Sequence, residues 1–187
     1  MSSEPVSASP EVAECLIRGL VLYSLAEFQT GHCKTIRVDA KNDSFSVSDD
    51  GRGHAIERTV ADAPYLQFIY THLDYPFTPP KEAPVQLHGI GMSLINVLCK
   101  ELTVMVRKPG FTFRMFFRNG SLCDQERVEA GSSGTGNTIS GIGVPHLSQG
   151  IDEQALMRWL HGIKAATPSL KLHFNGREIH GFSQSDA

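Results

Sequence analysis

Ser48-Asp49-Asp50-Gly51-Arg52-Gly53 places a carboxylate at the end of an alternating apolar run, residues 45–48, and two glycines follow at once. A second stretch, Leu87-His88-Gly89-Ile90-Gly91-Met92-Ser93, places two glycines directly before an apolar helical pattern. A carboxylate at a strand exit can accept a hydrogen bond from a heterocyclic amine, and glycines let the backbone approach a flat base. A glycine-rich helix entry presents free N–H groups to phosphate. Together the two stretches predict a nucleotide site.

Taken alone, residues 48–53 also fit an ordinary acidic turn that closes a β-hairpin. The presence of the second stretch, in this order along the chain, favours the nucleotide-type fold. A fold of that type does not by itself establish a function.

The composition is that of a soluble globular protein, with 187 residues, 41% hydrophobic and 20% charged. This length fits one domain with a substantial core. The net charge of −3 gives no electrostatic reason for the domain to bind nucleic acid. The local basic pair Arg107-Lys108 is interpreted as a solvated hairpin end rather than a patch that follows phosphates.

The cysteines are widely spaced, at Cys15, Cys33, Cys99 and Cys123. The N-terminus has no pattern of a signal peptide, and no apolar run approaches the ~20 residues that span a bilayer. We therefore expect reduced thiols and an intracellular, soluble, cytoplasmic protein that does not bind membranes. A nuclear location is equally compatible if the source is eukaryotic. A monomer is the default expectation.

The residue patterns predict an α+β two-layer sandwich, with a mixed sheet of about seven or eight strands backed by helices. Residues 1–9 are predicted to be a flexible arm, 10–182 a single domain and 183–187 a tail. A proline-rich loop at 74–84 is a candidate lid. The predicted helices are residues 10–30, 58–70 with a break at Pro64, 93–100 and 151–166. The predicted strands are residues 35–40, 45–48, 102–106, 111–118, 137–144 and 170–174, with an Asn175-Gly176 hairpin turn after the last.

Four motifs, in this order, resemble those of the gyrase B/type II topoisomerase N-terminal ATPase domain. That domain belongs to the GHKL superfamily of gyrase, heat-shock chaperone, histidine kinase and MutL ATPases. The motifs are Thr30-Gly31-His32-Cys33-Lys34, residues 48–53, residues 87–93, and Gly134-Thr135-Gly136-Asn137-Thr138. The resemblance covers residues 10–182 and implies a GHKL (Bergerat-type) ATPase fold with ATP as the cofactor.

The resemblance also implies roles for individual residues. Asp49 falls on the family's adenine-reading aspartate, and Gly51 and Gly53 fall on the glycines beside the base. Asn137 falls on a threonine that shares a water with that aspartate, and a slip of one residue would place Thr138 there instead. Arg52 and Lys108 fall on the rim of the site. The residues implied around the triphosphate are His88, Gly89, Ile90, Gly91, Met92 and Ser93.

The sequence departs from the family on the first helix. The family's catalytic glutamate falls on Gly19, and its magnesium-binding asparagine falls on Tyr23. Glycine cannot orient or deprotonate water, and a phenol is a poor ligand for a hard cation. The resemblance therefore gives no metal ligand in this chain and makes the use of Mg²⁺ doubtful.

No residue is assigned as a replacement for the lost base. Glu27 is about 80° around the helix and about 12 Å along its axis from Gly19. His54 and His88 lie near the predicted site by motif, but a histidine there is more often structural. Glu27, His54 and His88 are thus the candidates left.

We therefore expect a gyrase-B-like ATP-binding domain that is a degenerate ATPase, a pseudoenzyme acting as a nucleotide-binding or regulatory module. One alternative is an active ATPase domain of a type II DNA topoisomerase without its transducer domain. Another is a protein-interaction module with a vestigial pocket. The expected partners are an adenine nucleotide and, in the last case, another protein.

Overall fold

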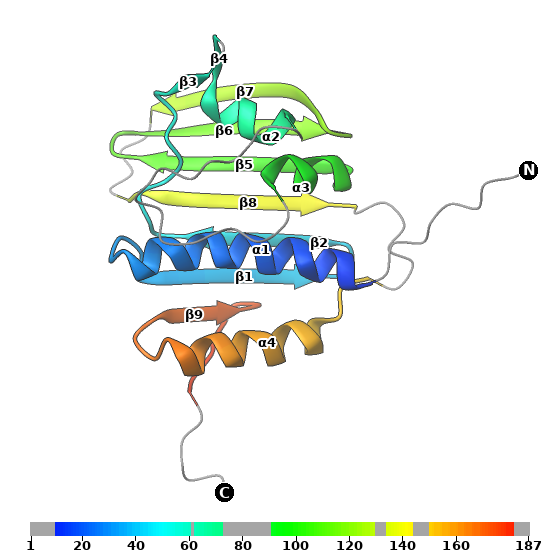
Figure 1. The fold of residues 1–187 in the computed structure, drawn as a ribbon, viewed down its shortest axis with the longest axis vertical. Helices are drawn as coiled ribbons and strands as arrows, with labels where there is room; N and C mark the ends of the chain where they lie inside the picture. The colour runs from blue at the N-terminus through cyan, green and yellow to red at the C-terminus, as the bar shows by residue number, and fades with distance from the viewer. Residues whose placement is uncertain (1–9, 61, 73–90, 130–133, 144–149, 182–187) are drawn as a thin grey trace, which may run out of the picture.

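A mixed sheet of eight strands forms the centre of the fold (Figure 1). The computed structural model of the chain describes residues 10–60, 62–72, 91–129, 134–143 and 150–181. The strand order is β10-β9-β1-β2-β8-β5-β6-β7, and a separate two-stranded hairpin pairs β3 with β4. Strands β1 and β9 run parallel, and every other neighbouring pair is antiparallel.

The strands are β1 (Thr35–Lys41), β2 (Ser44–Asp49), β3 (Thr59–Val60), β4 (Ala63–Pro64), β5 (Glu101–Lys108), β6 (Phe111–Arg118), β7 (Ser121–Glu129), β8 (Gly136–Ile142), β9 (Lys171–Phe174) and β10 (Arg177–Glu178). The helices are α1 (Pro10–Gln29), α2 (Tyr65–Thr71), α3 (Met92–Leu98) and α4 (Glu153–Ala166). Figure 1 shows α1 crossing β1 and β2, while α2 and α3 lie over the β5–β7 part of the sheet. The predicted α+β architecture of a mixed sheet backed by helices is confirmed.

Helix α1 supplies one wall of the core. Leu16, Leu20 and neighbouring apolar side chains are buried against the sheet, as its nearly continuous apolar sequence predicts. The helix ends at Gln29 because Gly31 adopts a left-handed conformation with φ of 80°. The amide of Gly31 then donates to the carbonyl of Phe28 at 2.9 Å, which turns the chain towards β1.

Strand β2 carries the first motif into the interior. Its burial alternates, so Phe45, Val47 and Asp49 share the buried face. The apolar pattern therefore ends with a carboxylate at a position that the strand period places inside the protein. Strand β8 pairs with β2 in a register that sets Thr138 opposite Ser48, which brings Asn137 next to Asp49.

The structure corrects the predicted helix over residues 58–70. Residues 59–64 form the β3–β4 hairpin instead, with Asp62 at a positive φ of 65° in its turn, and α2 begins only after Pro64. A proline ring fixes φ and removes the N–H that a helix interior requires. Pro64 therefore marks the N-terminal boundary of a helix rather than a break within one.

Strand β7 was not predicted from the sequence. It lies at the end of the strand order, paired with β6, and most of its side chains are exposed. An edge strand with both faces largely in water carries no apolar alternation, which is the pattern that reveals a strand in a sequence.

Some predictions fall outside the residues that the structure describes. These are the flexible arm at 1–9, the proline-rich loop at 74–84 and the tail at 183–187. Within the described ranges, none of the helices is both long enough and apolar enough to cross a lipid bilayer.

Candidate functional site

The Asp49 carboxylate is the centre of a buried hydrogen-bond cluster where α1, β2 and β8 meet. Only 3% of Asp49 is exposed. Its Oδ1 accepts from the amides of Gly51 at 2.9 Å and Asn137 at 3.2 Å. Its Oδ2 accepts from Ser24 Oγ at 3.0 Å and from the Asn137 side-chain Nδ2 at 3.4 Å. A carboxylate offers about four lone-pair positions, so the protein itself supplies a donor for each of them.

The two glycines of the first motif are required by close packing within the protein. A Cβ on Gly51 would lie 3.0 Å from Asp49 Oδ1 and 3.2 Å from the Glu27 side chain. Gly53 has a positive φ of 73°, and its Cβ would lie 3.0 Å from Val106. A side chain at either position would therefore push apart the elements that hold Asp49 in place. Their predicted place beside a base stays a prediction.

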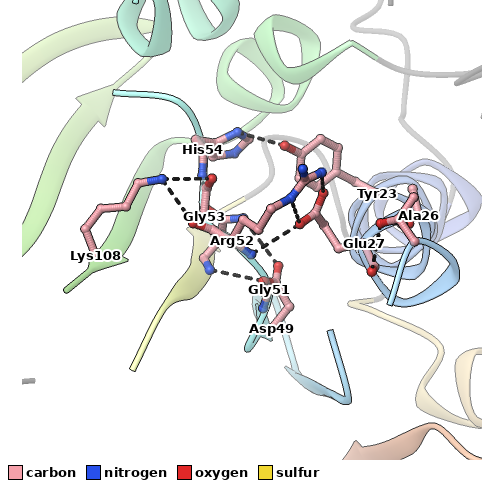
Figure 2. Close-up of polar contacts among 11 residues, drawn as sticks. Tyr23, Ala26, Glu27, Asp49, Gly51, Arg52, Gly53, His54 and Lys108 are labelled. Carbon is pink, nitrogen blue, oxygen red and sulfur yellow. Dashed lines mark hydrogen bonds and ion pairs between the residues drawn. The ribbon is translucent and has the colours of Figure 1, made fainter. Parts of the chain in front are cut away.

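Glu27, the acidic residue that α1 retains, is held by Arg52 (Figure 2). The Arg52 guanidinium donates at 3.0 Å and 2.7 Å to the two carboxylate oxygens, and the Arg52 amide adds a third bond at 3.2 Å. Hydrogen bonding from Arg52 holds the pKa of Glu27 below its usual value. A carboxylate stabilised in its charged form and fully engaged by an arginine is a poor general base.

His54 lies between two phenols in the interior. The Tyr23 hydroxyl is 3.0 Å from His54 Nδ1, and the Tyr70 hydroxyl is 3.4 Å from Nε2. The backbone amide of His54 donates to Asn137 Oδ1 at 2.9 Å, which connects this group to the Asp49 cluster. Burial, assisted by the charge of Lys108, lowers the pKa of His54 to about 4. Burial also raises the pKa of both tyrosines, so all three side chains are neutral near pH 7.

The burial of neutral His54 predicts a loss of stability on mild acidification. The pKa falls from an ordinary 6.5 to about 4 on folding, so between these values the unfolded chain binds a proton that the folded chain does not. This contribution is fully present above pH ~6.5 and is lost as the pH falls, by about 3 kcal/mol in all. Urea unfolding at a series of pH values should show this slope in the wild type and a smaller one in His54→Gln. Equal slopes in the two proteins would contradict the assignment.

Arg107 and Lys108 attach strand β5 to the first motif. The Arg107 guanidinium donates to the Asp49 carbonyl at 2.6 Å and to Thr138 Oγ1 at 2.8 Å. Lys108 Nζ donates to the carbonyls of Arg52 at 3.0 Å and Gly53 at 3.2 Å, as Figure 2 shows. The prediction that this basic pair is a solvated hairpin end is therefore wrong for the charged groups, which fix the backbone around Asp49.

The position predicted to have lost the catalytic glutamate is open. Among the described residues, no atom lies within 4 Å of a Cβ built on Gly19, and Tyr23 follows it one turn later on α1. Gly91 directly precedes α3, which starts with Met92 and buries Ser93. The remaining residues implied around the triphosphate, His88, Gly89 and Ile90, lie outside the described residues.

Sequence reasoning missed Ser24, Tyr70 and Arg107 as members of this site. Ser24 had a detectable signal, because it continues the buried Leu16–Leu20 face of α1 at helical spacing, and a buried polar side chain needs a partner. Tyr70 and Arg107 had none, since each reaches the site only through the folded arrangement of α2 and β5.

Within the described residues, no three histidine, cysteine, aspartate or glutamate side chains are grouped so as to hold a metal ion. The four thiols are free, with Cys33 and Cys99 buried.

Comparisons with known proteins point to one group of relatives. The chain is 33% identical over 129 residues to the DNA gyrase B protein of Campylobacter jejuni, a match that covers 66% of the chain. It is 35% identical over 133 residues, again 66% of the chain, to the gyrase B protein of Haloferax volcanii. For the gyrase B protein of Enterococcus faecalis the identity is 30% over 146 residues, or 75% of the chain. The matches span only 17% to 23% of the length of these relatives.

A search of solved structures finds the same fold. The topoisomerase IV ATP-binding domain of Francisella tularensis, solved with a small-molecule inhibitor, matches with a TM-score of 0.73 and 19% identity. The match covers 95% of this chain and 89% of that one. No protein-family model matches the chain. By sequence over about two thirds of its length, and by an eight-stranded α+β fold over nearly all of it, the chain belongs to the family of gyrase B and topoisomerase IV B ATP-binding domains.

Proposed function

We propose that this domain binds an adenine nucleotide and does not hydrolyse it efficiently, so that it acts as a nucleotide-binding or regulatory module. The observation that carries the proposal is the state of the acidic side chain that α1 turns towards the site. Glu27 is bound by Arg52 through three hydrogen bonds, while the position two turns earlier is Gly19. Within the described part of the chain, this face of α1 therefore presents no free carboxylate to activate water.

The base end of the site suits an adenine nucleotide. Asp49 is an acceptor at the exit of β2, and Gly51 keeps the backbone beside it free of a side chain. The exocyclic amine of adenine is a donor, which a buried carboxylate recognises well. Sequence similarity to gyrase B supports the same assignment.

The phosphate end does not suit magnesium. Tyr23 presents a phenol there that is hydrogen-bonded to His54 and whose pKa is raised by burial. Mg²⁺ prefers carboxylate, amide and water oxygens in octahedral geometry. We therefore assign no metal-dependent step to this chain, and we expect nucleotide binding to be independent of Mg²⁺.

A thermal-shift measurement with a non-hydrolysable ATP analogue tests the proposal. With ligand at about 100 times its Kd, the shift should correspond to about 2.7 kcal/mol, or a Tm rise of about 5 °C or more. The rise should be the same in Mg²⁺ and in EDTA. Ser140→Ala is a matched control, because it removes a β8 hydroxyl that bonds to Ser46 away from the Asp49 cluster, and it should bind normally.

Two results would contradict the proposal. The absence of a shift at millimolar analogue would remove nucleotide binding and favour an interaction module. Steady phosphate release from ATP by the wild type that disappears in Asp49→Asn would favour an active ATPase.

A further inference from the structure

The two oxygens of the Asp49 carboxylate are held in different ways by the described residues. Oδ1 accepts from backbone amides, those of Gly51 and Asn137. Oδ2 accepts from side chains, those of Ser24 and Asn137. Backbone donors in this position are fixed by the pairing of β2 with β8, whereas side-chain donors can rotate away. A ligand can therefore exchange more readily with a donor on Oδ2.

The donor on Oδ2 with the weaker geometry belongs to Asn137. Its Nδ2 is 3.4 Å from Oδ2, beyond the usual range of an N–H···O bond, while Ser24 Oγ is at 3.0 Å. The other end of the Asn137 amide is held at 2.9 Å by the backbone N–H of His54. The Asn137 side chain, only 1% of whose residue is exposed, is thus fixed over Oδ2 without making a strong bond to it.

We propose that the Asn137 side-chain amide occupies the position on Asp49 Oδ2 that a purine amine needs, and that it thereby sets the affinity of this domain for adenine nucleotides. This inference rests on the proposed function, because it concerns the same site. An amide N–H₂ and an aromatic amine are both neutral N–H donors, so one can replace the other on the carboxylate. The exchange returns little free energy, since one hydrogen bond is broken for each that forms.

Ser24 keeps the carboxylate satisfied during this exchange. Its hydroxyl stays on Oδ2 from the side of α1, while the two backbone amides stay on Oδ1. Shortening residue 137 should therefore open one acceptor position without leaving Asp49 bare. The shorter residue would also let the base amine bond to Asp49 without first displacing a protein donor.

The test compares ATP with inosine triphosphate in the full 187-residue chain. The two nucleotides differ at the base, where inosine carries an acceptor oxygen in place of the amine. Asn137→Thr removes the amide and keeps a residue suited to a strand. We expect ATP to bind about tenfold more tightly to this variant in calorimetric titrations, with inosine triphosphate unchanged. Asn137→Ser carries the same expectation and serves as a second variant if the threonine protein does not fold.

Each outcome decides the inference. If the wild type binds ATP and both variants bind it equally well or less tightly, the inference is wrong while the proposed function stands. Equal gains for both nucleotides would also overturn it, because the gain would not arise at the amine. If only the variants bind ATP, the inference stands and the proposed function fails for the wild type. If none of the proteins binds ATP, both fail. Ser140→Ala should bind both nucleotides as the wild type does.

Discussion

Asp49→Asn is expected to abolish nucleotide binding and to lower the free energy of unfolding by about 4 kcal/mol. The carboxylate accepts hydrogen bonds from Gly51, Ser24 and Asn137 at a position that is 3% exposed. Asparagine has one acceptor oxygen, and its NH₂ group would face donors that have no other partner among the described residues. Buried donors left without an acceptor cost about 1–3 kcal/mol each. Urea unfolding and titration with the ATP analogue measure the two effects.

Asp50→Asn provides the neighbouring control. Asp50 accepts from the backbone amides of Lys34 at 2.7 Å and Thr35 at 2.9 Å, outside the Asp49 cluster. It should lose some stability and still bind the analogue. An Asp49→Asn protein that binds ATP with wild-type affinity would remove Asp49 from the site and with it the basis of the proposed function.

The second expected result is a gain of ATP hydrolysis when Gly19→Glu and Tyr23→Asn are combined. A Cβ on Gly19 meets no described atom within 4 Å, so a side chain fits there, and leaving glycine also favours the helix. Glutamate supplies a general base, which contributes about 10²–10⁴-fold to a rate when it is well placed. Asparagine replaces a neutral phenol with an amide oxygen, a ligand that Mg²⁺ accepts. Phosphate release in the presence of Mg²⁺ should therefore rise about a hundredfold over the wild type.

The matched control is Gly19→Gln with Tyr23→Asn. It has nearly the same shape and helix propensity but no basic carboxylate, so it should bind nucleotide without hydrolysing it. Tyr23→Asn also removes the phenol from His54 Nδ1, so the stability of both double variants must be measured alongside. Equal phosphate release from the glutamate and glutamine proteins would contradict a direct role for the carboxylate. Unaltered binding and no hydrolysis in both would mean that α1 does not present residues 19 and 23 to the nucleotide.

Much of the fold was predictable because it depends on local patterns. The long apolar helix, the hairpin before Asp49 and the β5–β6 hairpin all have turn residues and periodicities that can be recognised in the sequence. Strand β7 was missed because its side chains are largely exposed, and residues 59–64 were misassigned because a short hairpin has too few residues for a period. Pro64 was recognised as a break, and only the structure shows which side of it is helical.

The sequence by itself determined which chemical groups this site can contain. It places Asp49 at a strand end, glycines after it, and glycine and tyrosine on α1 at the spacing where a base and a metal ligand were expected. Only the tertiary structure decided how these groups are engaged. Ser24, Asn137 and Arg107 lie 25, 88 and 58 residues from Asp49, yet all three contact it. No local pattern can report such contacts, because hydrogen-bond partners of a buried carboxylate are set by how helix and strands pack, and that packing determines whether Asp49 is open to a ligand.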